Sequence, residues 1–255
     1  MKKVAMSLLA LIVVGWLSVG SEAANAAMTP LFSAKIFDLQ DRSKHMFDYK
    51  NEFEVVGDKK TMLTTFLDLE GKVLVVEKTV VTVGENGSES LLSFEQDHRQ
   101  LGTIGKIEVA DGKAGFSFTK DGKTKTASET IEPNYIVTSM VLGFVQSNWE
   151  KLMKGETAKV RLGVVDRRES VGFSFSKESA TADKVVIKMK PTSMIISALV
   201  SPLRFTFQPD GKKLVELEGR AAVKVQKDGK FKDFDGFTVY TYAGSSPASG
   251  PANKK

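Results

Sequence analysis

The chain has 255 residues, of which 42% are hydrophobic and 26% charged, and it contains no cysteine. This composition is that of an ordinary globular protein, and it excludes wholesale disorder, a collagen-like repeat and a protein with many membrane spans. The missing cysteine excludes disulfides, thiolate metal sites, a cysteine nucleophile and a lipid-modified N-terminal cysteine. The formal net charge of +5 is a mild basic bias that does not by itself indicate a partner.

Residues 1–26 have the pattern of a secretory signal peptide. Lys2 and Lys3 precede an apolar run over residues 4–19, and the Ala-Asn-Ala stretch that ends at Ala26 fits an A-x-A cleavage site. We expect cleavage after Ala26 and a periplasmic protein that is not a lipoprotein. The alternative is an uncleaved N-terminal anchor, but a run of roughly 16 residues is short for a membrane-spanning helix.

Residues 27–242 are expected to form a single β-rich domain, because short alternating runs separated by turn signals follow one another from about residue 45. Asp-Gly pairs flanked by such runs predict tight antiparallel hairpins, since glycine adopts the positive φ of the turn. These pairs are Asp111-Gly112, Asp121-Gly122, Asp210-Gly211 and Asp228-Gly229. Residues 243–255 are rich in Ser, Pro and Gly, and they predict a disordered tail.

The alternation is clearest over residues 184–190. Val185, Ile187 and Met189 alternate there with lysines, which predicts a strand with one buried and one solvated face. Pairs of phenylalanines mark three further strands, namely Phe116 with Phe118, Phe173 with Phe175, and Phe205 with Phe207.

Two segments depart from the strand pattern. Residues 134–154 carry apolar residues at helical spacing and predict a long helix that is apolar on nearly all sides, with Asn134 as its cap and Gly155 as its stop. Residues 194–200, between two prolines, predict a second and shorter apolar helix.

Together these elements predict a mainly β (α+β) fold. It is a curved antiparallel sheet or half-open β-barrel of about ten strands, with one long and one short apolar helix packed on its concave side. Such a sheet can leave an apolar cavity, although the same residues can also fill an ordinary dry core. The candidate ligand-binding residues of this cavity and its lid are Phe116, Phe118, Val137, Val141, Phe144, Phe173, Phe175, Met194, Ile195, Leu199, Phe205 and Phe207.

The sequence holds no G-x-S-x-G, H-E-x-x-H, P-loop or calcium-loop motif. His45 and His98 lie in polar stretches that are typical of solvated loops. The residues around His98, among them Glu95, Asp97 and Arg99, are of the types found in acid/base or metal sites, but a solvated loop is the favoured interpretation. We therefore expect no catalytic residue, no metal and no cofactor. A hydrolase whose carboxylate pair or Ser/His pair converges from distant parts of the chain remains the least favoured alternative.

The lysines are spread among acidic and apolar residues, and together with export this excludes nucleic acid as a partner. Lys184, Lys188, Lys190, Lys224 and Lys227 can form a basic face on the sheet. This face either keeps the protein soluble or attracts anionic lipid head groups, at about 1 kcal/mol per charge near such a surface.

The order of the elements resembles the lipoprotein-carrier superfamily of the Gram-negative envelope, the Lol-type half-barrels, and its uncharacterised periplasmic relatives. The residues that carry the resemblance lie at 187–193, 202–211, 214–220 and 239–242. It implies that acyl chains or lipoproteins bind in the concave face. Lipid-modified receptor members need a cysteine that this chain does not have, so a soluble carrier or accessory protein is the closer analogue.

The leading hypothesis is a soluble periplasmic protein that binds a lipid, an acyl chain or another apolar ligand, with an envelope protein or a membrane surface as a further partner. The alternative is a structural or interaction protein of the envelope with a filled core and no ligand.

Overall fold

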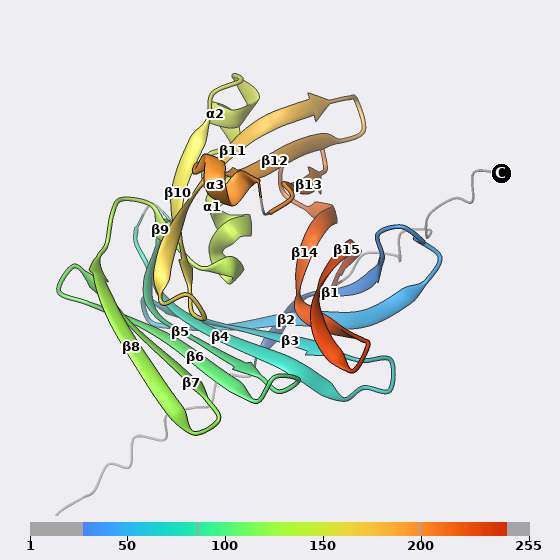
Figure 1. Ribbon diagram of the computed structural model, residues 1–255. Coiled ribbons are helices and arrows are strands. Elements are labelled where there is room, and N and C mark those ends of the chain that lie inside the picture. Colours follow the sequence, from blue (N-terminus) through green and yellow to red (C-terminus); the bar gives the residue numbers. More distant parts are fainter. Residues whose placement is uncertain (1–27, 86, 199, 244–255) are drawn as a thin grey trace, which may run out of the picture.

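The computed structural model describes residues 28–85, 87–198 and 200–243 (Figure 1). The predicted signal peptide, and the predicted tail beyond its first residue, lie outside these ranges.

Within the described residues, fifteen strands form one sheet. The strands of the first half are β1 (Thr29–Asp38), β2 (His45–Val56), β3 (Lys59–Leu67), β4 (Val73–Val83), β5 (Glu89–His98), β6 (Thr103–Ala110), β7 (Lys113–Lys120) and β8 (Lys123–Thr130). Those of the second half are β9 (Tyr135–Ile136), β10 (Ala158–Val164), β11 (Glu169–Ala180), β12 (Val185–Pro191), β13 (Leu203–Phe207), β14 (Leu214–Lys227) and β15 (Lys230–Tyr242).

Strands that follow one another in the sequence pair with each other, except for β8 and β9. Because β1 pairs with β15, β8 and β9 stand at the two ends of the order. Every pairing is antiparallel except that of β9 with β10. The hairpins predicted from Asp-Gly pairs between β6 and β7, β7 and β8, and β14 and β15 are confirmed. Their aspartates Asp111, Asp121 and Asp228 have φ of 50°, 49° and 52°, and each following glycine is also left-handed.

The prediction of about ten strands with two packed helices is wrong. β8 was predicted only through the turn at Asp121-Gly122, because its own sequence, Lys-Thr-Lys-Thr-Ala-Ser-Glu-Thr, has no apolar alternation, and its side chains are almost all exposed. β1 precedes residue 45, where the predicted strands begin, although Phe32, Ala34 and Ile36 alternate there and are buried.

The predicted long helix over residues 134–154 is replaced by several short elements. They are β9, the 3-10 helix η1 (Thr138–Met140), α1 (Val141–Ser147) and α2 (Trp149–Met153). Asn134 is not a cap, because its φ is 62° and the next two residues pair with β10. Asn148, with φ −106° and ψ 14°, separates α1 from α2. Gly155 follows α2 with φ 85°, in agreement with the predicted stop.

The predicted short helix is only α3 (Met194–Ser197), and it does not pack on the concave face along its length. Met194 is 89% exposed and Ile195 78% exposed, whereas Ile196 packs against the main core. A helix of one turn can direct only one of these three side chains toward the core.

The sheet curls so that α1 lies on its inner side, between the strands of the first half and β10 to β14 (Figure 1). In the described structure no strand pairing joins β8 to β9. The two halves of the sheet meet by close packing of β6 against the end of β10 instead. A Cβ atom at Gly105 on β6 would lie 2.6 Å from the Cβ of Val165, and one at Gly163 on β10 would lie 2.7 Å from the Cδ1 of Ile107. The sheet is therefore barrel-like without a continuous hydrogen-bonded wall.

The buried apolar side chains form two clusters. The main core contains inward residues of both halves together with η1, α1 and α2, and a smaller cluster around Val75 and Val223 lies between β1 to β4 and β14 to β15. The alternation predicted over residues 184–190 is confirmed: Val185, Ile187 and Met189 are buried. No helix in the described ranges is long and apolar enough to cross a bilayer.

Candidate functional site

The curled sheet and the segment η1–α1 form a partly open cavity of about 1090 Å³. Ligand-binding cavities are usually about 300–1,000 Å³ and mostly apolar, so this cavity is large enough for a lipid-sized molecule. Its apolar and aromatic lining comes from strands of both halves and from the helical segment. The lining includes Leu31, Phe32, Met62, Leu91, Met140, Val141, Leu142, Phe144, Phe173, Met189, Phe205, Leu217 and Tyr240.

The end of α1 and the start of α2 are held against the β13 side of the sheet. Trp149 lies with its ring centroid 5.3 Å from that of Phe207. It also covers Gly211, where a Cβ atom would lie 2.4 Å from the indole, so only glycine fits beneath it. The Nε2 of Gln146 donates to the carbonyl oxygen of Lys212 at 2.8 Å. These contacts hold α1 as a wall of the cavity.

Four polar side chains cross the concave face in one line, which we call the polar row: Asn51, Thr64, Glu77 and Gln96. They are direct cross-strand neighbours on β2, β3, β4 and β5, and all four line the cavity. Asn51 Nδ2 donates to Thr64 Oγ1 at 2.7 Å, and Gln96 Nε2 donates to Glu77 Oε1 at 2.8 Å. The row therefore places a line of hydrogen-bonding groups on the wall formed by β2 to β5.

Glu77 binds the helical segment to the sheet. Its side chain is buried, and Thr138 at the start of η1 donates its hydroxyl to Glu77 Oε2 at 3.3 Å. The hydroxyls of Thr79 and Ser139, next to them, are 2.6 Å apart. Burial raises the pKa of Glu77, and the hydrogen bonds from Gln96 and Thr138 oppose this only in part. The neutral acid form of this carboxyl is therefore favoured to higher pH than usual.

An aromatic cluster forms a neighbouring part of the wall. Tyr49 stacks on Phe66 with centroids 4.9 Å apart, and its hydroxyl is 3.2 Å from that of Tyr240. Phe32 makes edge contacts with Tyr49, Tyr240 and Tyr242. Burial raises the pKa of Tyr49 well above its ordinary value, so this phenol is neutral and contributes no charge to the cavity.

The predicted ligand-binding residues fall into several groups. Those that line the cavity are Val141, Phe144, Phe173 and Phe205. Those that are buried in the main core without lining it are Phe116, Val137, Phe175 and Phe207. Phe118 is half-buried on β7, Met194 and Ile195 are exposed on α3, and Leu199 lies outside the described residues.

The polar row was not predicted from the sequence. Glu77 shares its inward side with Val75 and Val81 on an alternating strand, and both valines are fully buried. A carboxylate among inward-facing valines was a visible signal, because buried acids are rare without a specific role.

The prediction of a solvated loop is wrong for His98, which ends β5 and is buried. Burial, and then the charge of Lys224, lower the pKa of its ring. The turn that follows docks on β14 through the side-chain amide of Gln100. Its Nε2 donates to the carbonyl oxygen of Lys224 at 3.0 Å, and its Oε1 accepts from the backbone N–H of Lys224 at 2.9 Å. His45 is half-buried at the start of β2, with Nε2 3.0 Å from Asp48 Oδ1.

The acidic residues near His98 do not gather into a metal site. Glu95 pairs with Lys106 at 2.8 Å, and Asp97 pairs with Arg99 at 3.0 Å, both at the surface. No group of three or more His, Cys, Asp or Glu side chains in the described part of the chain is arranged to hold a metal ion.

The basic face predicted from five lysines is interrupted by acids. Lys188 and Arg204 both pair with Glu178 at 2.8 Å, and Lys224 pairs with Asp233. Lys190 is exposed on the same strand as Lys188.

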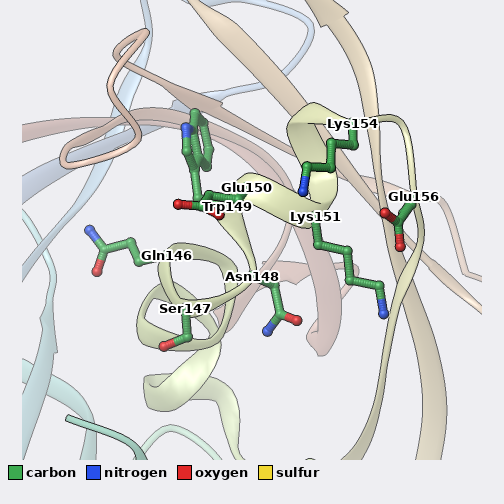
Figure 2. A pocket seen from close by; sticks show the side chains of 8 residues that line it. All are labelled: Gln146, Ser147, Asn148, Trp149, Glu150, Lys151, Lys154 and Glu156. Carbon is green, nitrogen blue, oxygen red and sulfur yellow. The ribbon is translucent and has the colours of Figure 1, made fainter. Parts of the chain in front are cut away.

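A second hollow of about 670 Å³ lies at the end of the helical segment (Figure 2). Its lining comes from one continuous stretch, residues 146–156, and is mostly polar. The side chains that Figure 2 labels point in different directions, so they do not converge on a common point as a catalytic site requires.

No family model matches the chain, and no curated protein matches its sequence. Among solved structures, the chain is similar to a beta-barrel-like protein of a domain of unknown function, DUF1849, from Brucella abortus. The identity is 12% and the TM-score 0.38, over 85% of this chain and 97% of that chain. It is also similar to a porin-like protein from Bacteroides uniformis, with 11% identity and a TM-score of 0.24 over 85% of this chain and 99% of that chain. These comparisons do not show the Lol-type family.

Proposed function

We propose that the protein binds a lipid, an acyl chain or another apolar ligand in the cavity between the curled sheet and the segment η1–α1. The observation that carries the proposal is the cavity of about 1090 Å³ with its largely apolar lining. A filled core would leave no such space, since protein interiors are close-packed.

The mechanism of binding is burial of apolar surface, which contributes about 25 cal/mol per Å² removed from water. No covalent step is required. The adaptable side chains of Met62, Met140 and Met189 line the cavity and suit ligands of varied shape. Val200, shortly after α3, also lines it, which supports a place for α3 at the rim.

The proposal includes export to the periplasm as a carrier or accessory protein in envelope lipid handling. The signal-peptide pattern of residues 1–26 supports the export, and the apolar cavity supports the handling of lipid.

A second candidate function is that of an interaction protein, and β8 favours it. This strand stands at one end of the sheet order, so one of its edges has no strand partner in the described structure. Such an edge can pair with a strand of another protein, although its lysines are of the kind that discourage nonspecific pairing.

Native mass spectrometry of the protein purified without detergent from its own cells tests the proposed function. We expect a complex with one apolar molecule, which organic solvent releases and a lipid analysis identifies. Recovery of the bare chain alone, together with failure to take up a neutral fluorescent apolar probe, would contradict the proposal.

A further inference from the structure

The polar row has two ends that differ in how their hydrogen bonds are used. At the Glu77–Gln96 end, both carboxylate oxygens have partners, one from Gln96 and one from Thr138 on the helical segment. This end anchors η1 to the sheet. Its polar groups are already used by the protein itself.

Among the described residues, no hydrogen bond joins the Asn51–Thr64 end to the helical segment. Asn51 and Thr64 are only 5% and 6% exposed, and the Oδ1 atom of Asn51 has no hydrogen-bond partner in the described structure. Thr64 accepts from Asn51, so its own hydroxyl proton remains available. A buried, unpaired acceptor of this kind usually costs about 1–3 kcal/mol, so it calls for an explanation.

These two groups lie side by side on the cavity wall and offer one acceptor and one donor. We infer that the ligand of the cavity is an amphipathic molecule with a neutral head group that both donates and accepts hydrogen bonds. A hydroxyl or an amide is such a head group, and Asn51 and Thr64 are the residues that receive it. This inference rests on the proposed function, because it names the class of ligand that the same cavity takes.

A carboxylate head group fits this end poorly. It has acceptors only, so it would place one oxygen against Asn51 Oδ1, and burying its charge without a cation is unfavourable. In the described part of the chain, three cations line the cavity. Lys60 pairs with Glu89 at 2.8 Å and Arg220 pairs with Asp235 at 2.6 Å, while Lys212 is largely exposed, with its Nζ 3.9 Å from Asp210.

The apolar remainder of the ligand then lies against the surrounding wall. On the same inward faces, Met62 and Phe66 flank Thr64 along β3, and Phe32 lies opposite Asn51 on β1. Anchoring the head group at the row orients the apolar part of the ligand within the cavity.

The test is displacement of the neutral probe N-phenyl-1-naphthylamine from the full chain by 1-dodecanol, dodecanamide and, at pH 8, dodecanoate. We expect the alcohol and the amide to displace the probe at concentrations about tenfold lower than dodecanoate. Thr64→Val removes the hydroxyl at nearly constant volume. It should weaken the binding of 1-dodecanol by about three- to tenfold, in keeping with the loss of one net hydrogen bond. Thr64→Ser keeps the hydroxyl and should restore the binding.

Thr65→Val is the matched control, because Thr65 is buried on the next position of β3 and does not line the cavity. This variant should leave the displacement of the probe by all three ligands unchanged. Equal displacement by dodecanoate and dodecanol, or equal effects of Thr64→Val and Thr65→Val, would overturn the head-group assignment and leave the proposed function standing. Failure of the probe and of all three ligands to bind would contradict the proposed function itself.

Discussion

Glu77 anchors the helical segment to the sheet and also places a titratable group in the cavity wall. Its carboxyl lies within the polar row, is buried, and holds η1 through Thr138. Because burial raises its pKa, the folded protein keeps the proton at pH values where the unfolded chain has already lost it. Wherever the unfolded state binds fewer protons than the folded state, stability falls as pH rises.

Glu77→Gln should therefore change the pH dependence of folding. Between the ordinary pKa of 4.5 and the raised pKa of the folded state, the wild type should lose stability relative to the variant as pH rises. The slope should reach at most about 1.4 kcal/mol per pH unit. Urea unfolding of both proteins from pH 4 to pH 8 measures it. Parallel profiles would show that the carboxyl has the same pKa in the folded and unfolded chain.

At the scale of elements, the sequence predicts what a local pattern encodes. The hairpins at Asp111, Asp121 and Asp228 follow from their two-residue turns, and the strand with Val185 and Ile187 follows from its alternation. The segment 134–154 could not be predicted in the same way. Its helical spacing is real, but the left-handed Asn134 and the interruption at Asn148 divide it into short pieces.

Only some of the predicted ligand-binding residues line the cavity. Val141, Phe144, Phe173 and Phe205 line the cavity, whereas Phe175 and other predicted residues are in the dry core. Which inward residue faces a void and which faces a neighbour depends on the curl of the sheet, and no local pattern specifies that curl. The polar row depends on the register of β2, β3, β4 and β5, and no local sequence pattern specifies that register either.

Substitutions in α3 test whether Met194 and Ile195 are exposed while Ile196 packs against the core. Replacing both Met194 and Ile195 by serine should change the free energy of unfolding by no more than about 0.5 kcal/mol, because both side chains are exposed. Ile196→Ser, which removes the side chain that packs against the core, should cost about 1–2 kcal/mol. Denaturant midpoints of the two variants check this. A large loss of stability in the double variant would mean that α3 is covered in solution.

At the scale of the whole molecule, the two halves of the sheet are joined by packing of β6 against the end of β10, and no strand pairing in the described structure joins β8 to β9. Gly105 permits this contact, because a Cβ atom there would lie 2.6 Å from Val165. A continuous barrel would fix the size of the interior by its hydrogen bonds. Here the fit between β6 and the end of β10 fixes it instead.

Gly105→Ala should push these two parts of the sheet apart and lower the free energy of unfolding by about 1–3 kcal/mol, the usual cost of overpacking. Gly115→Ala on β7 is the control, since its Cβ would make only an ordinary contact at 3.8 Å with the carbonyl oxygen of Glu108. Thermal unfolding compares the two. Equal stability of both variants would show that β6 and Val165 do not pack closely in solution.

The central claim is that the interior of the curl holds an apolar ligand, and titration of N-phenyl-1-naphthylamine into the full chain and two variants tests it most directly. Leu217 lines the cavity on β14, and Leu217→Trp should fill part of it. Val215→Trp adds a similar bulk on the same strand at a residue that does not line the cavity. We predict saturable binding of one probe per chain by the wild type and by Val215→Trp, and binding at least tenfold weaker by folded Leu217→Trp. Equal binding by all three proteins, or no binding by the wild type freed of its endogenous ligand, would contradict the claim.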